Sequence, residues 1–317
     1  MSVRREVSLA IAILLLAAML AGVAPGFFSA ANLHDLLIAN TPVLIAALGM
    51  TLVILTGQID ISTGAQFAIC GVVAGAVAKL VPVGVAGAVA CLAGAFLGGI
   101  NGALVAYARI PAIVVTLATM VGLRDGLRWV TEGAWVQDLP AGFQWFGQSQ
   151  AVSEGITVAS AAMLAAAAGW GLRHMAAGRA IYATGSNPDA ARLAGINPAR
   201  VVFSVFTAAG ALTGCAAWLN SVRFNQIPSN AGLGMEMQVI AAVIVGGAAV
   251  TGGKGTVSGT LLGVVLLGMA GPALTFLGIS AYWERAIQGG IILAAVAIDG
   301  LRARRKSYGG ALAPERA

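Results

Sequence analysis

The chain has 317 residues, of which 59% are hydrophobic and only 9% charged, and its formal net charge is +6. A water-soluble domain carries charge on about a quarter of its residues, so this composition excludes an ordinary soluble protein and indicates a polytopic membrane protein. The apolar runs are long and continuous, which excludes a transmembrane barrel. The expected fold class is all-α: one domain over residues 1–317, a transmembrane helical bundle of about 10 spans (8–10), some of them broken or re-entrant.

The apolar runs define the expected spans in chain order. They lie at about 7–23, 42–56, 61–80, 83–107, 110–130, 156–172, 201–219, 238–253, 256–277 and 286–301. Several are shorter than the roughly 20 residues that a spanning helix needs. His34 and His174 fall between runs, and we expect them in loops on opposite sides of the membrane.

A short polar break, LTGQIDISTGAQ (55–66), separates the second run from the third and contains Asp60. A buried carboxylate without partners is costly, and the expected topology places Asp60 at a membrane face. We expect Asp60 to cap the helix that follows by accepting backbone N–H bonds. A role at a partner contact or in a transport pathway is the alternative.

Charged residues in the fifth run also stand out. Asp125 and Arg128 are one helical turn apart and are expected to pair; Arg124 lies beside them. All three fall toward the outer end of their span, where long side chains can reach the membrane surface. We expect a structural role or a contact with a receptor rather than a sugar site.

The segment GRAIYATGSNPDAARLAGINPAR (178–200) predicts a short helix between two spans. Asn187 and Pro188 form a helix start, and Asp189 suits the positive end of the helix dipole. The helix is expected over residues 189–193 and to end at Gly195. Such a helix could dock into a groove on a partner; an ordinary connecting loop with a surface helix is the alternative.

A second glycine-rich break, TGGKGTVSG (251–259), lacks the spacing of an ATP-binding Walker loop, because Lys254 is followed by Gly255. With the break at 57–64 it gives a faint suggestion of internal duplication. The sequence has no GxSxG or HExxH motif, and its three cysteines lie in apolar runs without metal-ligand spacing. We expect neither catalysis nor a metal or cofactor bound by this chain, and no nucleic-acid binding.

Charge asymmetry sets the expected orientation. The segment 173–200 carries four arginines and the tail at 302–317 begins with a basic cluster, whereas the segment 131–155 has no Lys or Arg. The positive-inside rule therefore predicts both termini and the 173–200 segment in the cytoplasm and the 131–155 loop outside.

The stretch ATGSNPDAARLAGINPAR (183–200) resembles the coupling segment of permease subunits in ATP-binding-cassette importers, of the family shared by ribose-type sugar permeases and branched-chain amino-acid permeases. Similar segments occur in family order at GMTLVILTGQIDISTGA (49–65), NGALVAYARIPAIVVTLAT (101–119) and NAGLGMEMQVIAAVIVGGAAVTGGKGTVSGTLLG (230–263). The TGGID of the sugar branch stands here as TGQID (56–60). Within that branch, RIPAIVVTLATM (109–120) with EGAWVQDLP (132–140) most resembles permeases for rhamnose and the autoinducer-2 furanose.

The resemblance implies a permease subunit in the bacterial inner membrane that imports a rhamnose-, autoinducer-2- or ribose-class sugar. Its implied partners are a cytoplasmic ATPase that binds ATP and Mg²⁺, a periplasmic sugar-binding protein, and a second permease copy or paralogue. The loop at 131–155 would then be periplasmic. A branched-chain amino-acid permease is the alternative within the family; an ion-coupled secondary transporter and a membrane scaffold are alternatives outside it.

Three groups of residues are expected to carry this function. The ATPase-coupling group comprises Gly185, Asn187, Asp189, Ala190, Ala191, Arg192 and Gly195. The break comprises Gly57, Asp60, Ser62 and Gly64. Polar residues inside the spans are pathway candidates or interhelical hydrogen-bond partners: Thr51, Gln66, Asn101, Thr116, Thr119 and Gln238.

Overall fold

The computed structural model describes residues 2–280, 283, 286–287, 289–290 and 293, with side chains from residue 6 onward. The basic tail at 302–317 and most of the last expected span, 286–301, lie outside the described residues. Within the described part the chain is helical and its only strand-like pairing is an isolated bridge between Val136 and Ile227, so the all-α prediction is confirmed.

The helices are named in chain order. The longer ones are α1 (Ser2–Val23), α2 (Ala30–Leu55), α3 (Thr63–Ala78), α4 (Val83–Ala106), α5 (Ala112–Thr131), α6 (Gln150–His174), α9 (Pro198–Ser221) and α11 (Val257–Phe276). The shorter ones are η1 (Pro25–Phe28), η2 (Gln144–Gly147), α7 (Ala176–Ser186), α8 (Pro188–Leu193) and α10 (Met235–Val245).

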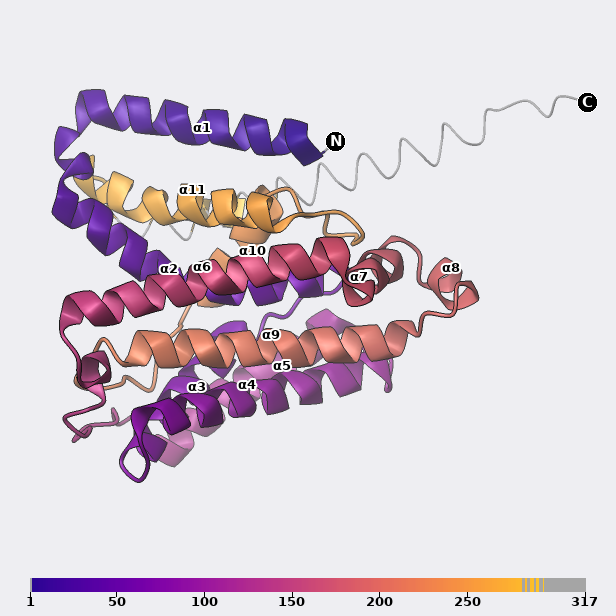
Figure 1. Cartoon of the computed structure of the whole chain (residues 1–317), viewed down its shortest axis with the longest axis horizontal. Helices are drawn as coiled ribbons and strands as arrows, with labels where there is room; N and C mark the ends of the chain where they lie inside the picture. Colours follow the sequence, from indigo (N-terminus) through magenta and orange to yellow (C-terminus); the bar gives the residue numbers. More distant parts are fainter. Residues whose placement is uncertain (1, 281–282, 284–285, 288, 291–292, 294–317) are drawn as a thin grey trace, which may run out of the picture.

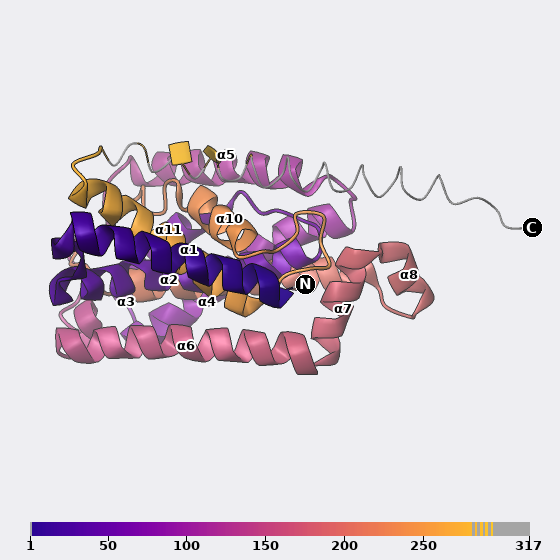
Figure 2. The same cartoon turned by 90° about the horizontal axis from the view of Figure 1, so that it is seen from above.

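The long helices lie side by side along one axis, and α7 and α8 project from one end of the bundle (Figures 1 and 2). We call this end the α8 end and the opposite one the far end. Six helices within the described residues are long and apolar enough to cross a membrane: α1 from Glu6, α2, α4, α6, α9 and α11. This is a multi-pass membrane bundle.

Small residues bring the central helices close together. Gly94 of α4 and Gly210 of α9 face one another so closely that a Cβ on either would overlap the other's backbone. In lipid, where apolar surface gains nothing from leaving the solvent, such backbone approach is a main source of helix association. The α4–α9 pair and the largely buried α2 thus form the centre of the bundle.

Two spans are interrupted, as expected. Helix α3 has 16 residues and α10 has 11, or about 24 and 17 Å, less than the roughly 30 Å of a hydrocarbon core. Each is a half-helix beside a break, the first at residues 56–62 and the second at 246–256. The half-helices begin next to each other, since Gly64 at the start of α3 packs against Gly232 and Glu236 at the start of α10.

Three sequence predictions are wrong in detail. The second span begins at Ala30 rather than at 42, because Ser29 accepts a bond from the Asn32 N–H and starts the helix earlier. His34 therefore lies in α2 and His174 is the last residue of α6, so neither is in a loop. The run predicted over 238–253 ends as a helix at Val245, because closely spaced glycines favour a turn over continued helix.

Candidate functional site

Helix α8 stands at the tip of the α8 end (Figure 1). The side-chain oxygen of Asn187 accepts the N–H groups of Asp189 and Ala190, both at 3.0 Å, which confirms the expected helix start. Arg192 pairs with Asp189 at 2.8 Å on the exposed face. The helix thus holds itself in shape by local bonds while projecting from the bundle.

The two faces of α8 differ. Ala191 is buried against the chain's own helices, whereas Leu193 is 93% exposed. Ala190 and Gly195 are also exposed. Leu193 is therefore an apolar side chain on a projecting helix that the described part of the chain leaves uncovered. The sequence reasoning stressed the small residues and missed Leu193.

Behind α8, the end of α7 packs into a three-way junction, made of Leu55–Gly57, Gly185–Ser186 and Gly252–Gly255. Gly185 lies so close to the Leu55 carbonyl oxygen that a Cβ would overlap it. The Gly253 N–H donates to the same Leu55 oxygen at 2.9 Å. The two interrupted spans and the projecting segment therefore meet through their backbones, with little room for side chains.

A side-chain bond also ties α7 to the second break. The Tyr182 hydroxyl donates to the Gly255 carbonyl oxygen at 2.8 Å. Burial raises the pKa of the Tyr182 phenol, and the nearby charge of Arg173 lowers it by less, so Tyr182 remains a neutral donor. A displacement of α8 would be transmitted through α7 to both breaks. The sequence did not predict α7, whose 11 residues fall within the expected 173–200 loop.

Asp60 lies at the centre of a buried polar network. Its Oδ1 accepts from the Ser62 N–H at 2.9 Å and from the Ser62 hydroxyl at 2.5 Å, and its Oδ2 accepts from the Gln66 amide at 3.0 Å. Asn101 donates to the Ser62 hydroxyl at 2.8 Å. The network holds the first break to α3 and α4.

The capping expected of Asp60 is found only in part: it accepts one backbone N–H, that of Ser62, but Ser62 is itself the N-cap of α3 and no side chain caps that helix. Asp60 is 2% exposed, and its network partner Asn101 lies five residues before the end of α4, about 8 Å inside that helix end. The break folds back into the bundle, because side chains on α3 and α4 supply the donors that a buried carboxylate requires.

The other pathway candidates are dispersed rather than gathered around one cavity. Thr116 lies near the first break, within 3.4 Å of the Ile59 carbonyl oxygen. Thr51 bonds to Thr260 of α11 at 2.7 Å, which joins two helices. Thr119 donates to the Thr116 carbonyl oxygen, and Gln238 is partly exposed on α10.

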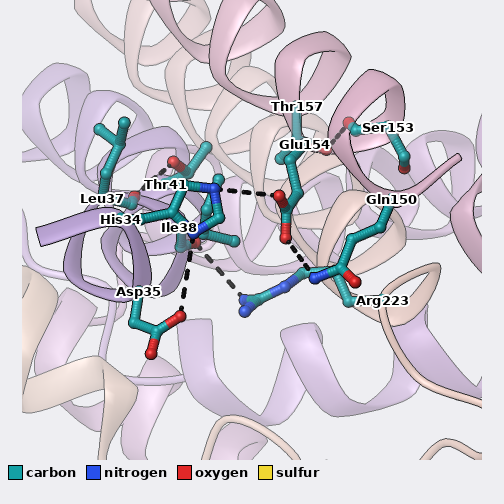
Figure 3. A network of polar contacts seen from close by, with 10 residues as sticks. All are labelled: His34, Asp35, Leu37, Ile38, Thr41, Gln150, Ser153, Glu154, Thr157 and Arg223. Carbon is teal, nitrogen blue, oxygen red and sulfur yellow. Dashed lines mark hydrogen bonds and ion pairs between the residues drawn. The ribbon is translucent and has the colours of Figure 1, made fainter. Parts of the chain in front are cut away.

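A further polar cluster lies at the far end, where α2, α6 and the segment after α9 meet (Figure 3). His34 and Glu154 point toward each other at 3.0 Å, and Gln150 donates to the other Glu154 oxygen at 3.0 Å. Arg223 reaches the Ile38 carbonyl oxygen at 3.5 Å. Burial lowers the pKa of Arg223, and the charges of Glu154 and Asp35 counter that shift.

One more ionic contact was not anticipated. Arg124 of α5 approaches Glu236 of α10 inside the bundle, at 3.8 Å, while Asp125 and Arg128 form the expected pair at 3.7 Å on the exposed face. The only signal in the sequence was one charge in or beside each of two apolar stretches, at positions 112 residues apart. Among the described residues, no group of three His, Cys, Asp or Glu side chains could hold a metal ion.

Comparison with known proteins gives a consistent result. Residues 32–296 match the family described as the branched-chain amino acid transport system permease component. The chain is 37% identical to the ribose import permease protein RbsC of Escherichia coli (strain K12) over 91% of its length and 92% of that protein. It is 34% identical to RbsC of Haemophilus influenzae (93% of each chain) and 35% identical to the autoinducer 2 import system permease protein LsrC of Salmonella typhi (93% of this chain, 86% of that one).

No solved structure matches the chain. The family match covers more than half of the sequence, and the relatives align over almost all of it. A transport permease agrees with the multi-pass helical bundle described above. The chain therefore belongs to the family of transport-system permease components.

Proposed function

We propose that the chain is the membrane-spanning subunit of an ATP-binding-cassette importer in the bacterial inner membrane, and that its cargo is a monosaccharide of the ribose or autoinducer-2 class. The observation that carries the transport mechanism is the three-way junction: a self-capped helix with an exposed leucine, joined by backbone contacts to both interrupted spans. The relatives that align over most of the chain are import permeases for ribose and autoinducer 2.

The sidedness follows from charge. The described α8 end carries Arg109, Arg173, Arg179, Arg192, Arg200 and Lys254, all in or beside the segments that leave the bundle there. A basic surface of this kind faces the cytoplasm. An ATPase subunit would then dock on α8, and a binding protein would deliver cargo to the far end.

The mechanism is a shift between two conformations. ATP binding by the partner favours one position of α8, and the junction transmits the movement to the breaks at 56–62 and 246–256. Because each break begins or ends a half-helix, a small displacement there can tilt α3 and α10 and so change which side of the membrane is open. A second copy of this chain or a paralogue would complete the pathway.

Reconstituted transport tests the proposal. The purified chain, its own ATPase and its binding protein are placed in liposomes with ATP inside, and uptake of radiolabelled ribose and of leucine is measured. ATP-dependent uptake of the sugar alone is expected. Uptake of leucine alone would favour the amino-acid alternative, and uptake driven by an ion gradient without ATPase would favour a secondary transporter.

A further inference from the structure

Arg124 and Glu236 are two charges buried together with unused hydrogen-bonding atoms. Their side chains are only 14% and 10% exposed, and Arg124 Nη2 lies 3.8 Å from Glu236 Oε2, beyond hydrogen-bond distance. Both terminal nitrogens of Arg124 and Oε2 of Glu236 lack a hydrogen-bond partner among the residues that the structure describes. By contrast, the Asp60 carboxylate uses both of its oxygens.

The pair lies where the two half-helices begin. Glu236 is the second residue of α10 and packs on Gly64, the second residue of α3, where an added Cβ would overlap Glu236 Oε2. Arg124 lies seven residues, about 10 Å, before the end of α5. The pair therefore lies inside the bundle, about two helical turns from the far end of α5, next to the elements that the junction would move.

An ion pair so arranged is a poor stabilising device. Taking two charges out of water costs several kcal/mol per ion, which their attraction offsets only when further hydrogen bonds satisfy the remaining atoms. Ionisable groups at membrane depth are rare and tend to line the route of a transported substance. Here the terminal nitrogens of Arg124 lack acceptors for their N–H groups, and Oε2 of Glu236 lacks a donor.

A hydroxyl group supplies both kinds of bond. It accepts a bond from a guanidinium while donating its own proton to a carboxylate, and two adjacent hydroxyls of a sugar ring match the planar fork of an arginine and the two oxygens of a glutamate. The side chain of a branched-chain amino acid offers neither bond.

We propose that Arg124 and Glu236 bind the hydroxyl groups of the cargo as it passes through the membrane. This inference rests on the proposed import of a sugar and adds the residues that recognise it inside the bundle. The bonds form when the half-helices separate and are replaced by the direct ion pair when they close. Occupancy is brief, because a pathway must release what it binds.

The test replaces the pair by apolar residues of similar size, Arg124→Met with Glu236→Leu. A purely structural buried pair tolerates such a replacement, often with no loss of stability. We expect the double variant to assemble with its ATPase and to lose at least about tenfold in ribose uptake, since hydrogen bonds to charged groups are lost from the route. Uptake within about twofold of the wild type would overturn the proposal.

The matched control is Asp125→Leu with Arg128→Met on the same helix. These side chains are 66% and 61% exposed and pair with each other. The control therefore removes the same kinds of charge from α5, but from a pair that does not contact α10. Uptake by the control is measured with the binding protein saturated, so that a weakened receptor contact at this exposed pair does not limit the rate, and it is expected within about twofold of the wild type. An equal loss in both double variants would also overturn the assignment.

A second measurement keeps the proposal testable if the first variant fails to assemble. Glu236→Gln preserves size, and its uptake of ribose and of each monodeoxyribose is compared with that of the wild type, with the binding protein saturated. We expect the preference for ribose over one particular deoxy analogue to fall several-fold in the variant; identical preferences for every analogue would refute hydroxyl recognition. If the wild-type complex imports no monosaccharide, the proposed function itself is refuted. If the wild-type complex imports ribose and the variant shows the same preferences, only the role assigned to Arg124 and Glu236 is refuted.

Discussion

At the scale of single residues, Gly185 decides how the projecting segment is attached. Its Cα approaches the backbone of α2 and of the second break so closely that no side chain fits: an added Cβ would overlap the Leu55 oxygen and lie 2.7 Å from the Gly253 nitrogen. Neither obstacle is the flexible end of a side chain, so the backbones themselves would have to separate. Only glycine therefore fits at this point, where the backbones of three segments meet.

We expect Gly185→Ala to weaken the junction by about 1–3 kcal/mol, the usual cost of overpacking, and to lower the sugar transported per ATP hydrolysed. The measurement is uptake and ATP hydrolysis by the same reconstituted complex. Gly171→Ala is the control, because an added Cβ there would meet only the Met175 sulfur at 3.5 Å, an ordinary contact. Unchanged coupling in Gly185→Ala would show that the junction can move apart freely.

Some of these residues could be identified from sequence and others could not. Asp60, Gln66 and Asn101 stood out because polar side chains in apolar runs need partners, and the structure brings them together. The sequence could not show that Arg124 meets Glu236, since that contact depends on how deeply α5 and α10 sit beside each other. The roles of all these residues in transport remain predictions.

At the scale of elements, α8 was predicted almost to the residue, and α7 not at all. The signals for α8 are local: Asn-Pro at its start, Asp189 in its first turn and Gly195 after its end, where φ is +79°. Helix α7 has no such start signal, because Met175 at its N-cap makes no side-chain bond. The sequence also did not show that the first break folds into the bundle. The side chain that holds the break there, Asn101 of α4, is about 40 residues away in the chain.

The exposed end of α8 gives the second prediction. Leu193→Asp should reduce binding of the ATPase by about 2 kcal/mol or more, roughly thirtyfold in Kd, because a carboxylate would be buried where a leucine packed. Co-purification of the ATPase with the tagged permease and a titration of their binding measure the effect. The chain should still insert and fold, since Leu193 contacts little of it.

Leu80→Asp is the matched control for α8. Leu80 is 85% exposed between α3 and α4 at the far end, so the same change is made away from the expected ATPase. Ala191→Trp would be a less informative variant, because Ala191 is buried within the chain and a bulky residue there would disturb α8 itself. If Leu193→Asp binds the ATPase as tightly as Leu80→Asp does, α8 does not dock through this residue.

At the scale of the whole molecule, basic residues are more numerous at the α8 end, whereas Lys79, Arg128 and Arg223 lie toward the far end with the acidic segment 132–149. The membrane class could be predicted from composition, because so few charges cannot cover the surface of a soluble protein. The helical fold could be predicted from the long, continuous apolar runs. The number of spans was harder to predict: α3 and α10 are half-helices whose apolar runs look like complete ones. Only the contact of Gly64 with Gly232 and Glu236 shows that both half-helices begin inside the bundle.

The sidedness gives the last prediction. In a variant with Cys70, Cys91 and Cys215 replaced by alanine, a cysteine at Asp138 should react with a membrane-impermeant thiol reagent added to spheroplasts, and a cysteine at Asp189 should not. Both positions are exposed, so a difference in reactivity reports the side of the membrane rather than burial. After detergent permeabilisation both should be labelled, which controls for the chemistry of each site. Labelling of the Asp189 position in sealed spheroplasts would place α8 outside, where no ATP-driven partner could reach it, and would refute both the orientation and the coupling role of the junction.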